Sequence, residues 1–276
     1  MYIVIDIPHI EPIVFIQSND KNIYQYFMMK FSPYCKYCCT INAHEKEKEF
    51  KFYRIIYNTK KEYDWYDENT YLHTFSSLTI GRGLSIFMHY ILKSNRQHVV
   101  MHGGAVCHNH HGIALLGESF AGKTTLTSYL VGNGFQYYTD DLIIYNSNNH
   151  ILTPFPNPVH LRKDTLLLLQ NHGVTLPVKE YSGFSYERYI FFPQTQISPC
   201  KLETFILLNR QNTIQPTIRL LQKDESFHAI MRHSYAADCI QYYIIAAKDI
   251  SRTCAVYELT YSHLEDAKML IEHIFK

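Results

Sequence analysis

Gly117-Glu118-Ser119-Phe120-Ala121-Gly122-Lys123-Thr124 matches the phosphate-binding pattern G-x-x-x-x-G-K-[ST] at every fixed position. An apolar run, Ile113–Leu116, precedes this stretch, and a helical run, Thr124–Val131, follows it. A strand, a glycine-containing turn and a helix N-terminus in this order direct backbone N–H groups and the helix dipole at an anion. The alternative, a chance match in an ordinary strand–turn–helix, is disfavoured by the fixed positions and their flanks together.

The motif predicts a nucleotide site in which Lys123 reaches the β- and γ-phosphates and the Thr124 hydroxyl completes the shell of Mg²⁺. We therefore expect ATP and Mg²⁺ as cofactors. The expected nucleotide-binding residues are Gly117, Glu118, Ser119, Phe120, Ala121, Gly122, Lys123, Thr124 and Thr125.

Two adjacent carboxylates, Asp140 and Asp141, follow the next expected strand, Phe135–Tyr138. Neighbouring carboxylates repel each other unless a metal ion or hydrogen bonds stabilise their charge. Beside a phosphate loop, one of them can hold Mg²⁺ and the other can accept a proton from an attacking hydroxyl. The alternative is an Asp-rich turn without a catalytic role.

Glycine is concentrated around these motifs, because seven of the 11 glycines fall between Gly103 and Gly134 and residues 1–80 contain none. Such a cluster marks backbone that bends sharply or approaches another group closely. Residues 1–98 instead predict a β-rich domain, with strands near 2–7, 13–17 and 50–57 and a helix near 84–93. We expect a second, catalytic domain over 99–276 and substrate recognition by the first.

His102 is a further candidate, because it precedes the phosphate loop by 15 residues. From Val99 onward the sequence predicts two strands joined by a turn at Asn109–Gly112. His102 would then lie on the strand that pairs with the loop's own strand and would end beside the phosphates. The alternative is an ordinary core histidine.

Arg162 and Arg188 are candidate cations for the phosphates or the substrate, or else surface charges. Beyond them the sequence predicts helical structure at about 222–248 and a terminal helix. Ser262 and Glu265 have the spacing of a capping box at the start of that last helix.

The 276 residues are 46% hydrophobic and 18% charged, which excludes a disordered chain. A net charge of +1 gives no general attraction to nucleic acid or anionic lipid. The longest apolar runs fall short of the ~20 residues of a membrane span, and residues 1–12 lack the basic start of a signal peptide. We expect a cytoplasmic protein without nucleic-acid or membrane partners, and the sequence leaves open a homo-oligomer.

Across 99–145 the sequence resembles the HPr serine kinase family, which shares its catalytic core with phosphoenolpyruvate carboxykinase. The resemblance rests on the phosphate loop together with His102-Gly103-Gly104-Ala105-Val106, Gly112-x-Ala114-Leu115-Leu116-Gly117 and Leu130-x-x-x-Gly134-x-x-Tyr137-x-Thr139-Asp140-Asp141. It implies an α+β fold with a phosphate-loop kinase core and a small β-rich N-terminal domain. It also implies that His102 lies near the γ-phosphate or a second metal ion, and that one carboxylate is the base and the other a metal contact. We assign Asp140 as the base and Asp141 to Mg²⁺.

The glycine-rich and C-terminal signatures of the bifunctional HPr kinase/phosphorylase are absent, and the stretch Pro154–Asp164 stands where the first would lie. The chain is more similar to the family's stand-alone kinases, some of which phosphorylate a Ser hydroxyl of a lasso-type precursor peptide. We therefore expect one-way transfer of a phosphoryl group to a Ser, or a Thr, of a peptide or protein. The alternatives are a nucleotide-gated peptide-binding module and a kinase that acts on an HPr-like carrier protein.

Overall fold

The computed structural model describes residues 2–6, 13–31, 35–38, 50–76, 98–155, 157–183, 186–191, 198–211, 215–234 and 240–275. The chain divides into two compact units: unit 1 is Met1–Asn95 with Tyr181–Glu187, and unit 2 is Arg96–Glu180 with Arg188–Lys276. The helix expected near 84–93 lies outside the described residues. Within the described part of the chain, no helix is both long and apolar enough to span a membrane.

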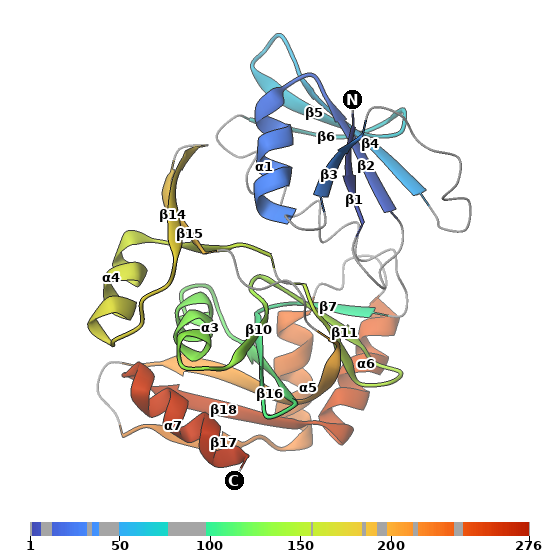
Figure 1. Cartoon of the computed structure of the whole chain (residues 1–276). Coiled ribbons are helices and arrows are strands. Elements are labelled where there is room, and N and C mark those ends of the chain that lie inside the picture. Colours follow the sequence, from blue (N-terminus) through green and yellow to red (C-terminus); the bar gives the residue numbers. More distant parts are fainter. Residues whose placement is uncertain are drawn as a thin grey trace. The chain divides into compact units, whose positions relative to one another are not determined.

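Unit 1 contains a mixed sheet with the strand order β3-β1-β2-β4-β5-β6 (Figure 1). Strands form at the three segments expected from the sequence, and a helix that the sequence analysis missed follows β2. This helix begins after Asp20, whose carboxylate accepts a hydrogen bond from the Asn22 N–H, and it buries Ile23 and Phe27 one turn apart. The elements are β1 (Tyr2–Ile5), β2 (Ile13–Ser18), α1 (Lys21–Phe31), β3 (Cys35–Cys38), β4 (Phe50–Tyr57), β5 (Glu62–Asp67) and β6 (Thr70–Ser76).

The remaining elements follow in chain order from His98 to Ile274. They are β7 (His98–His102), β8 (Gly104–His108), β9 (His111–Leu116), α3 (Lys123–Gly132), β10 (Gln136–Thr139), β11 (Leu142–Asn146), β12 (Ile151–Thr153), β13 (Val159–Leu161), α4 (Lys163–Asn171), β14 (Val178–Gly183), β15 (Tyr186–Phe191), β16 (Cys200–Arg210), β17 (Thr217–Leu220), α5 (Lys223–His233), α6 (Ile240–Thr253), β18 (Ala255–Tyr261) and α7 (Leu264–Ile274).

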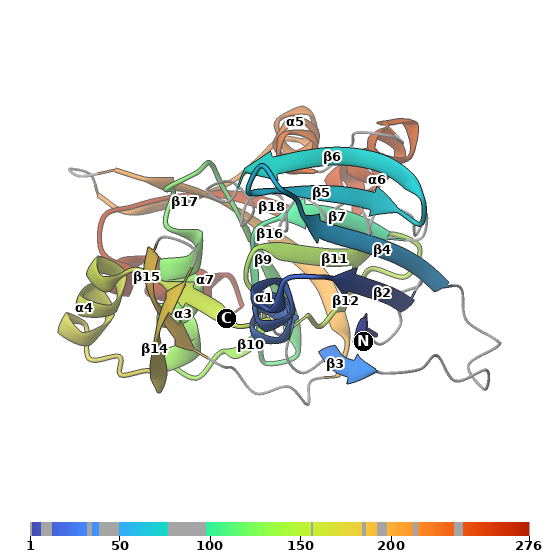
Figure 2. The ribbon, with the colours of Figure 1, turned by 90° about the horizontal axis from the view of Figure 1, so that it is seen from above.

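The main sheet of unit 2 has the order β10-β8-β9-β16-β12-β11-β7, and β18 pairs with β16 and β17. Its two faces bury different side chains, because residues alternate between the faces along each strand. Ile113 and Leu115 of β9 pack with α3, α4 and α7, whereas Ala114 and Leu116 pack with α5 and α6. Helices therefore cover both faces (Figure 2).

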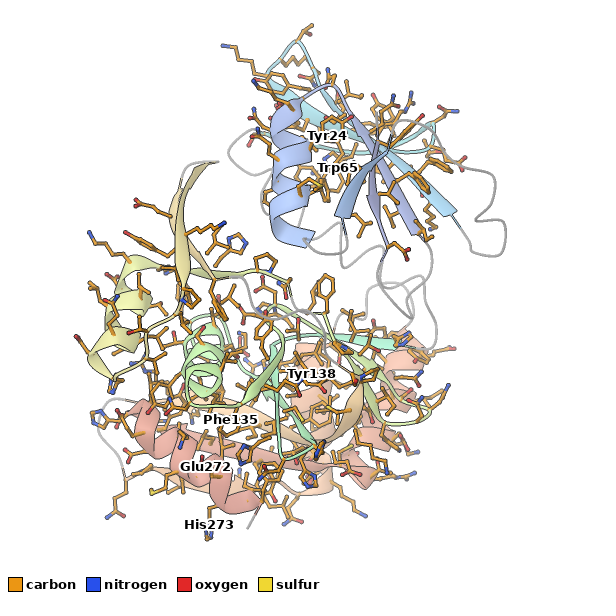
Figure 3. All side chains as sticks on the ribbon, viewed as in Figure 1. Tyr24, Trp65, Phe135, Tyr138, Glu272 and His273 are labelled. Atoms are coloured by element: carbon orange, nitrogen blue, oxygen red, sulfur yellow. The ribbon has the colours of Figure 1, made fainter. Side chains whose placement is uncertain are left out.

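Phe135 immediately precedes β10, and Tyr138 lies within it (Figure 3). The Phe135 side chain packs in the core on one face of the sheet, and the Tyr138 side chain packs in the core on the other. Strand β10 does not pair with β9, because β8 lies between them and runs antiparallel to both. The carboxyl ends of β9 and β10 consequently point the same way, which places the phosphate-loop motif and the acidic pair at one edge of the sheet.

Of the two strands expected from Val99 onward, the first is not continuous, because the chain breaks at Gly103 into β7 and β8. Strand β8 pairs with β9, as expected, but β7 pairs with β11, on the other side of the sheet. A Cβ at Gly103 would lie 2.5 Å from the Leu115 carbonyl oxygen, and one at Gly104 would lie 2.1 Å from Thr127 Oγ1. Only glycine therefore fits at these two positions, where the backbone passes close to Leu115 and Thr127.

The helical segment expected at about 222–248 consists of two helices, α5 and α6, on either side of residues that are not described. The capping box expected at the last helix is wrong. Helix α7 has His263 as its N-cap without a side-chain hydrogen bond, and Glu265 instead contacts the His172 ring.

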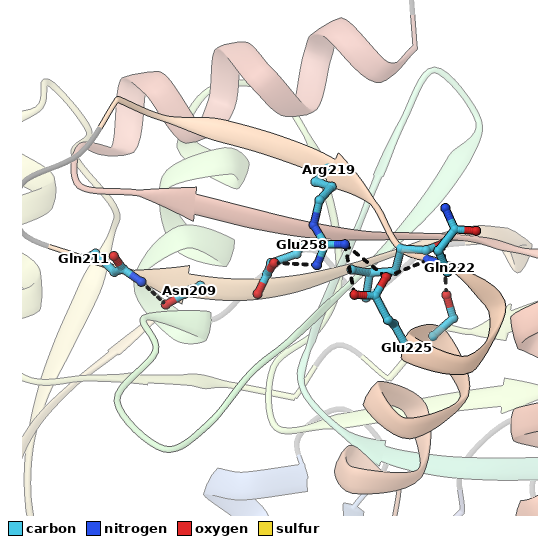
Figure 4. Close-up of polar contacts among 8 residues, drawn as sticks. Asn209, Gln211, Arg219, Gln222, Glu225 and Glu258 are labelled. Carbon is cyan, nitrogen blue, oxygen red and sulfur yellow. Dashed lines mark hydrogen bonds and ion pairs between the residues drawn. The ribbon is translucent and has the colours of Figure 1, made fainter.

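A capping box occurs at α5, between Gln222 and Glu225. Arg219 of β17 donates two hydrogen bonds of 3.0 Å to Glu225 and one of 3.1 Å to Glu258 of β18 (Figure 4). These contacts fix the N-terminus of α5 against the sheet.

Candidate functional site

Residues 117–124, here called the glycine loop, connect the buried strand β9 to helix α3. Its root is buried, whereas Glu118, Ser119 and Phe120 are exposed at its tip. Gly122 is the N-cap of α3 and has φ 90°, a left-handed conformation that favours glycine. A Cβ there would lie 2.9 Å from the Tyr261 hydroxyl, which itself donates a hydrogen bond to the Ala121 carbonyl. Both backbone conformation and space therefore require the second motif glycine.

Lys123 extends back into the glycine loop. Its ammonium donates hydrogen bonds of 2.8 Å to the Gly117 carbonyl and 2.9 Å to the Glu118 carbonyl, and the side chain is 8% exposed. Burial lowers the pKa of Lys123, while Asp140, Asp141 and Glu118 act in the opposite direction. The structure thus encloses one ammonium group between the loop and the two carboxylates.

The acidic pair lies where β10 ends, and Asp140 contacts the first turn of α3. The Thr124 hydroxyl donates a hydrogen bond of 3.0 Å to Asp140 Oδ2. Asp140 is 4% exposed, and its backbone N–H lies 3.3 Å from Asn157 Oδ1. The contact joins two residues that the sequence analysis selected separately.

Asp141 lies in the turn from β10 to β11 and has φ 82°. A non-glycine residue in the left-handed region stores backbone strain, which persists only where neighbouring contacts hold it. The carbonyl oxygen of Asp141 accepts a hydrogen bond of 3.3 Å from the Gly103 N–H, and the Thr139 hydroxyl closes the turn on the Leu142 carbonyl. The turn therefore orients the two carboxylates differently: Asp140 is buried and Asp141 is half-buried.

Asn157 supports this turn and was not predicted. Its side chain is 1% exposed, and Oδ1 accepts hydrogen bonds from Tyr137, Thr139 and the Asp140 backbone at 3.2–3.3 Å. Asn157 comes from the proline-punctuated stretch after β12, where the sequence offers no spacing that would signal such a contact.

His102 reaches the site by a route other than the expected one. Its strand, β7, pairs with β11, opposite Leu142, and not with the strand of the glycine loop. The ring nevertheless lies at the acidic turn, with Nδ1 3.1 Å from the Asp141 carbonyl oxygen. The Nδ1–H tautomer would donate to this oxygen, which leaves Nε2 as an acceptor.

Arg162 also lies beside the glycine loop, at its exposed tip. The residue is the N-cap of α4, and its guanidinium carbon is 5.1 Å from the centre of the Phe120 ring. This cation–π contact at an exposed site contributes about 0.5–1 kcal/mol. Phe120 is 80% exposed and has φ 68°, so an aromatic ring in a strained loop position holds the arginine.

Arg188 lies on β15, and only its backbone placement is described. Leu161 of β13 pairs with Tyr189 of β15. Since Arg162 follows Leu161 and Arg188 precedes Tyr189, the antiparallel register places both arginines beyond the same end of this pair.

Helix α5 adds two residues that the sequence analysis missed. Arg232 Nε lies 2.6 Å from Glu118 Oε1, an ion pair between α5 and the glycine loop. The next residue, His233, is 8% exposed, and its charged and titratable neighbours are Glu118, Lys123, Arg232 and His102. Desolvation, opposed by Glu118, lowers the pKa of His233 to about 4. No periodicity or spacing in the sequence connects α5 with the loop.

The donor set fits a magnesium ion that arrives with phosphates. Among the described residues there is no group of three His, Cys, Asp or Glu side chains that would enclose a metal ion. Mg²⁺ is typically bound by one or two protein oxygens together with substrate phosphates and water. Thr124 Oγ1 and Asp140 Oδ2 are such oxygens, 3.0 Å apart beside the buried ammonium of Lys123.

No family model matches the chain, and no curated protein matches it. A solved structure of the HPr(Ser) kinase/phosphatase from Coxiella burnetii is similar in part, with 12% sequence identity and a TM-score of 0.32. That match covers 64% of this chain and 96% of the Coxiella chain.

Proposed function

We propose that this chain is an ATP-dependent kinase that transfers the γ-phosphoryl group to a Ser, or a Thr, of a peptide or protein. The observation that carries the proposal is the hydrogen bond between Thr124 and Asp140. It joins the hydroxyl that the glycine loop offers to Mg²⁺ with a buried carboxylate, next to Lys123. Phosphoryl transfer depends chiefly on positioning and charge neutralisation, and these residues are suited to both.

The contacts favour a division of roles between the carboxylates that is the reverse of the sequence-based assignment. Asp140 Oδ2 accepts a hydrogen bond from the Thr124 hydroxyl, so a cation bound to Thr124 would also lie beside Asp140. Asp141 is the more exposed of the two, and its carbonyl oxygen accepts a hydrogen bond from the Gly103 N–H. We therefore assign Asp140 to Mg²⁺ and Asp141 as the base. The bound ion would neutralise charge on the β- and γ-phosphates.

In the proposed step, the acceptor hydroxyl oxygen bonds to the γ-phosphorus while the bond from that phosphorus to the β,γ-bridging oxygen breaks. Asp141 takes the hydroxyl proton, and ADP leaves with Lys123 against its phosphates. His102 orients the acidic turn through the Asp141 carbonyl. Arg162, held on Phe120, supplies a cation at the loop tip.

The acceptor we propose is a Ser-containing precursor peptide of the lasso type, as the resemblance to stand-alone kinases of the HPr serine kinase family implies. Unit 1 offers a surface for an extended peptide. Strand β6 ends its sheet, pairs with β5 alone among the described residues, and has exposed side chains from Thr70 to His73. An edge strand of this kind can bind a peptide as an added strand.

The test is mass spectrometry of Ser-containing candidate peptides incubated with the full chain and Mg·ATP. The expected product carries one phosphate on Ser, and the Lys123→Ala variant should not form it. Binding of Mg·ATP without transfer to any peptide or to a carrier protein would favour the nucleotide-gated binding module instead.

A further inference from the structure

His233 is a buried polar side chain that the proposed reaction does not use. It ends α5, is 8% exposed, and its ring makes no hydrogen bond with any other residue that the structure describes. Its nitrogen atoms nevertheless keep access to solvent, so they can form hydrogen bonds with water or with a bound ligand. The ring is therefore accessible to a ligand that binds beside the glycine loop, to which the neighbouring Arg232 is paired.

The surroundings of His233 indicate where that partner would lie. Four charged or titratable groups act on the ring: Glu118 of the glycine loop, Lys123 of α3, His102 of β7 and its own neighbour Arg232. Three of these groups belong to the candidate nucleotide site. Near neutral pH the ring is uncharged, because burial lowers its pKa to about 4. A neutral imidazole still donates one hydrogen bond and accepts another.

Contacts at both ends of α5 hold His233 in this place. The capping box and the Arg219–Glu225 contacts fix the start of the helix. At its end, Arg232 pairs with Glu118, and Ser234 forms a β-bridge with Met101 of β7. The ion pair is largely exposed, with 71% and 63% of the side chains accessible, so it contributes little stability. It does keep the last turn of α5 beside the glycine loop.

The end of a helix carries partial negative charge, which disfavours a phosphate nearby. Donor side chains at the end of α5 offset this effect, and the last two residues, Arg232 and His233, are both donors. We propose that His233 contacts the nucleotide, donating a hydrogen bond from its imidazole N–H to an oxygen of the γ-phosphoryl group beside Lys123. This inference rests on the proposed function, because it requires that ATP binds at the glycine loop.

The test compares the binding of Mg·ATP and Mg·ADP to the full chain by calorimetry. Loss of one hydrogen bond to a charged group weakens binding by roughly ten- to one-hundredfold. We expect His233→Leu to weaken the binding of Mg·ATP by about that factor and the binding of Mg·ADP by less than about threefold. His233→Gln should lose less, because its amide N–H can replace the imidazole donor. His98→Gln is the matched control: His98 is buried at the far end of β7, and this change should leave both affinities unaltered.

Thermal unfolding of the ligand-free variants monitors a purely structural effect, and His233→Gln answers the question if His233→Leu fails to fold. Equal losses for Mg·ATP and Mg·ADP, or unchanged Mg·ATP affinity, would overturn the role of His233. Failure of the unmodified chain to bind either nucleotide would instead contradict the proposed function itself.

Discussion

The Thr124 hydroxyl lies 3.0 Å from Asp140 Oδ2 and donates a hydrogen bond to it. This contact connects the first turn of α3 with the end of β10 across the edge of the sheet, and it distinguishes the two adjacent carboxylates. In the proposed reaction, Asp140 binds Mg²⁺ and Asp141 accepts the proton of the acceptor hydroxyl.

The carboxylates should therefore give different phenotypes. We expect Asp140→Asn to raise the Mg²⁺ concentration needed for half-maximal turnover, about tenfold or more, because one hard oxygen ligand is weakened. Asp141→Asn should bind Mg·ATP normally and lose transfer by roughly 10²–10⁴-fold. Magnesium titrations of turnover, with calorimetry for binding, measure both effects. Exchanged phenotypes would reverse the roles, and full activity of both variants would exclude the site.

Lys123→Ala should strongly lower turnover without unfolding the chain. The ammonium contacts the Gly117 and Glu118 carbonyls, and the two lost hydrogen bonds would cost about 1–2 kcal/mol of the free energy of unfolding. Turnover should fall by about 10²–10³-fold, the scale of losing one preorganised donor. A matched variant, Lys179→Ala, removes a lysine from β14 and should keep wild-type turnover. Unchanged turnover in Lys123→Ala would exclude the phosphate-loop assignment.

Gly122→Ala should be more destabilising than Gly134→Ala. Both glycines have left-handed φ values, 90° and 92°, so both substitutions add backbone strain. Only at Gly122 would the new Cβ meet another group, the Tyr261 hydroxyl at 2.9 Å. We expect a decrease of about 1–3 kcal/mol for Gly134→Ala and a larger one for Gly122→Ala, measured by denaturant unfolding. Tyr261→Phe should partly rescue Gly122→Ala, and equal losses at the two glycines would contradict this account.

Asn157→Leu should destabilise unit 2 and lower turnover together. The substitution removes the side-chain acceptor of the Asp140 N–H, whereas the Tyr137 and Thr139 hydroxyls keep the main-chain carbonyls of Asn157 and Leu142 as acceptors at 2.8 Å. The expected loss is about 1–3 kcal/mol of unfolding free energy, the cost of removing the acceptor of one buried donor. Asn157→Asp keeps an acceptor oxygen but adds charge beside Asp140, so it should raise the pKa of Asp140 and shift the turnover–pH profile upward. A stable and fully active Asn157→Leu variant would exclude Asn157 as the support of the turn.

Acid should destabilise the wild type more than His233→Gln. Burial lowers the pKa of His233 from 6.5 to about 4 in the folded chain. Between these two values the unfolded chain binds the additional proton, so stability rises with pH and is lost as pH falls from 6.5 towards 4. The difference between wild type and His233→Gln should reach about 2 kcal/mol, discounted for partial solvent access. Parallel stability–pH curves for the two proteins would contradict the burial of a neutral ring.

The local motifs were predictable because each depends on short-range chemistry. The glycine loop requires a strand, a left-handed glycine and a helix start in succession, and the structure has β9, Gly122 and α3 in that order. Asp140 and Asp141 follow the next strand and lie at the same edge of the sheet. These relations span fewer than about 30 residues, the length of one strand–helix–strand unit.

Contacts between distant segments could not be predicted from spacing. The pairing of β7 with β11 depends on the crossing at Gly103, where the surrounding packing, and not the local strand pattern, breaks the strand. Asn157 and His233 reach the site from a loop and a helix end that carry no signature. In unit 1, the helix α1 was missed because Ile23 and Phe27 lie among aromatic residues that also favour strands.

The central claim is that the glycine loop and the acidic pair bind Mg·ATP for phosphoryl transfer. Calorimetric titration of the full chain with ATP, with and without Mg²⁺, tests it most directly, beside Lys123→Ala under the same conditions. The account predicts saturable binding that requires Mg²⁺ for full affinity and is weakened at least about tenfold by Lys123→Ala. No binding by the unmodified chain, or equal affinity in the Lys123→Ala variant, would contradict it.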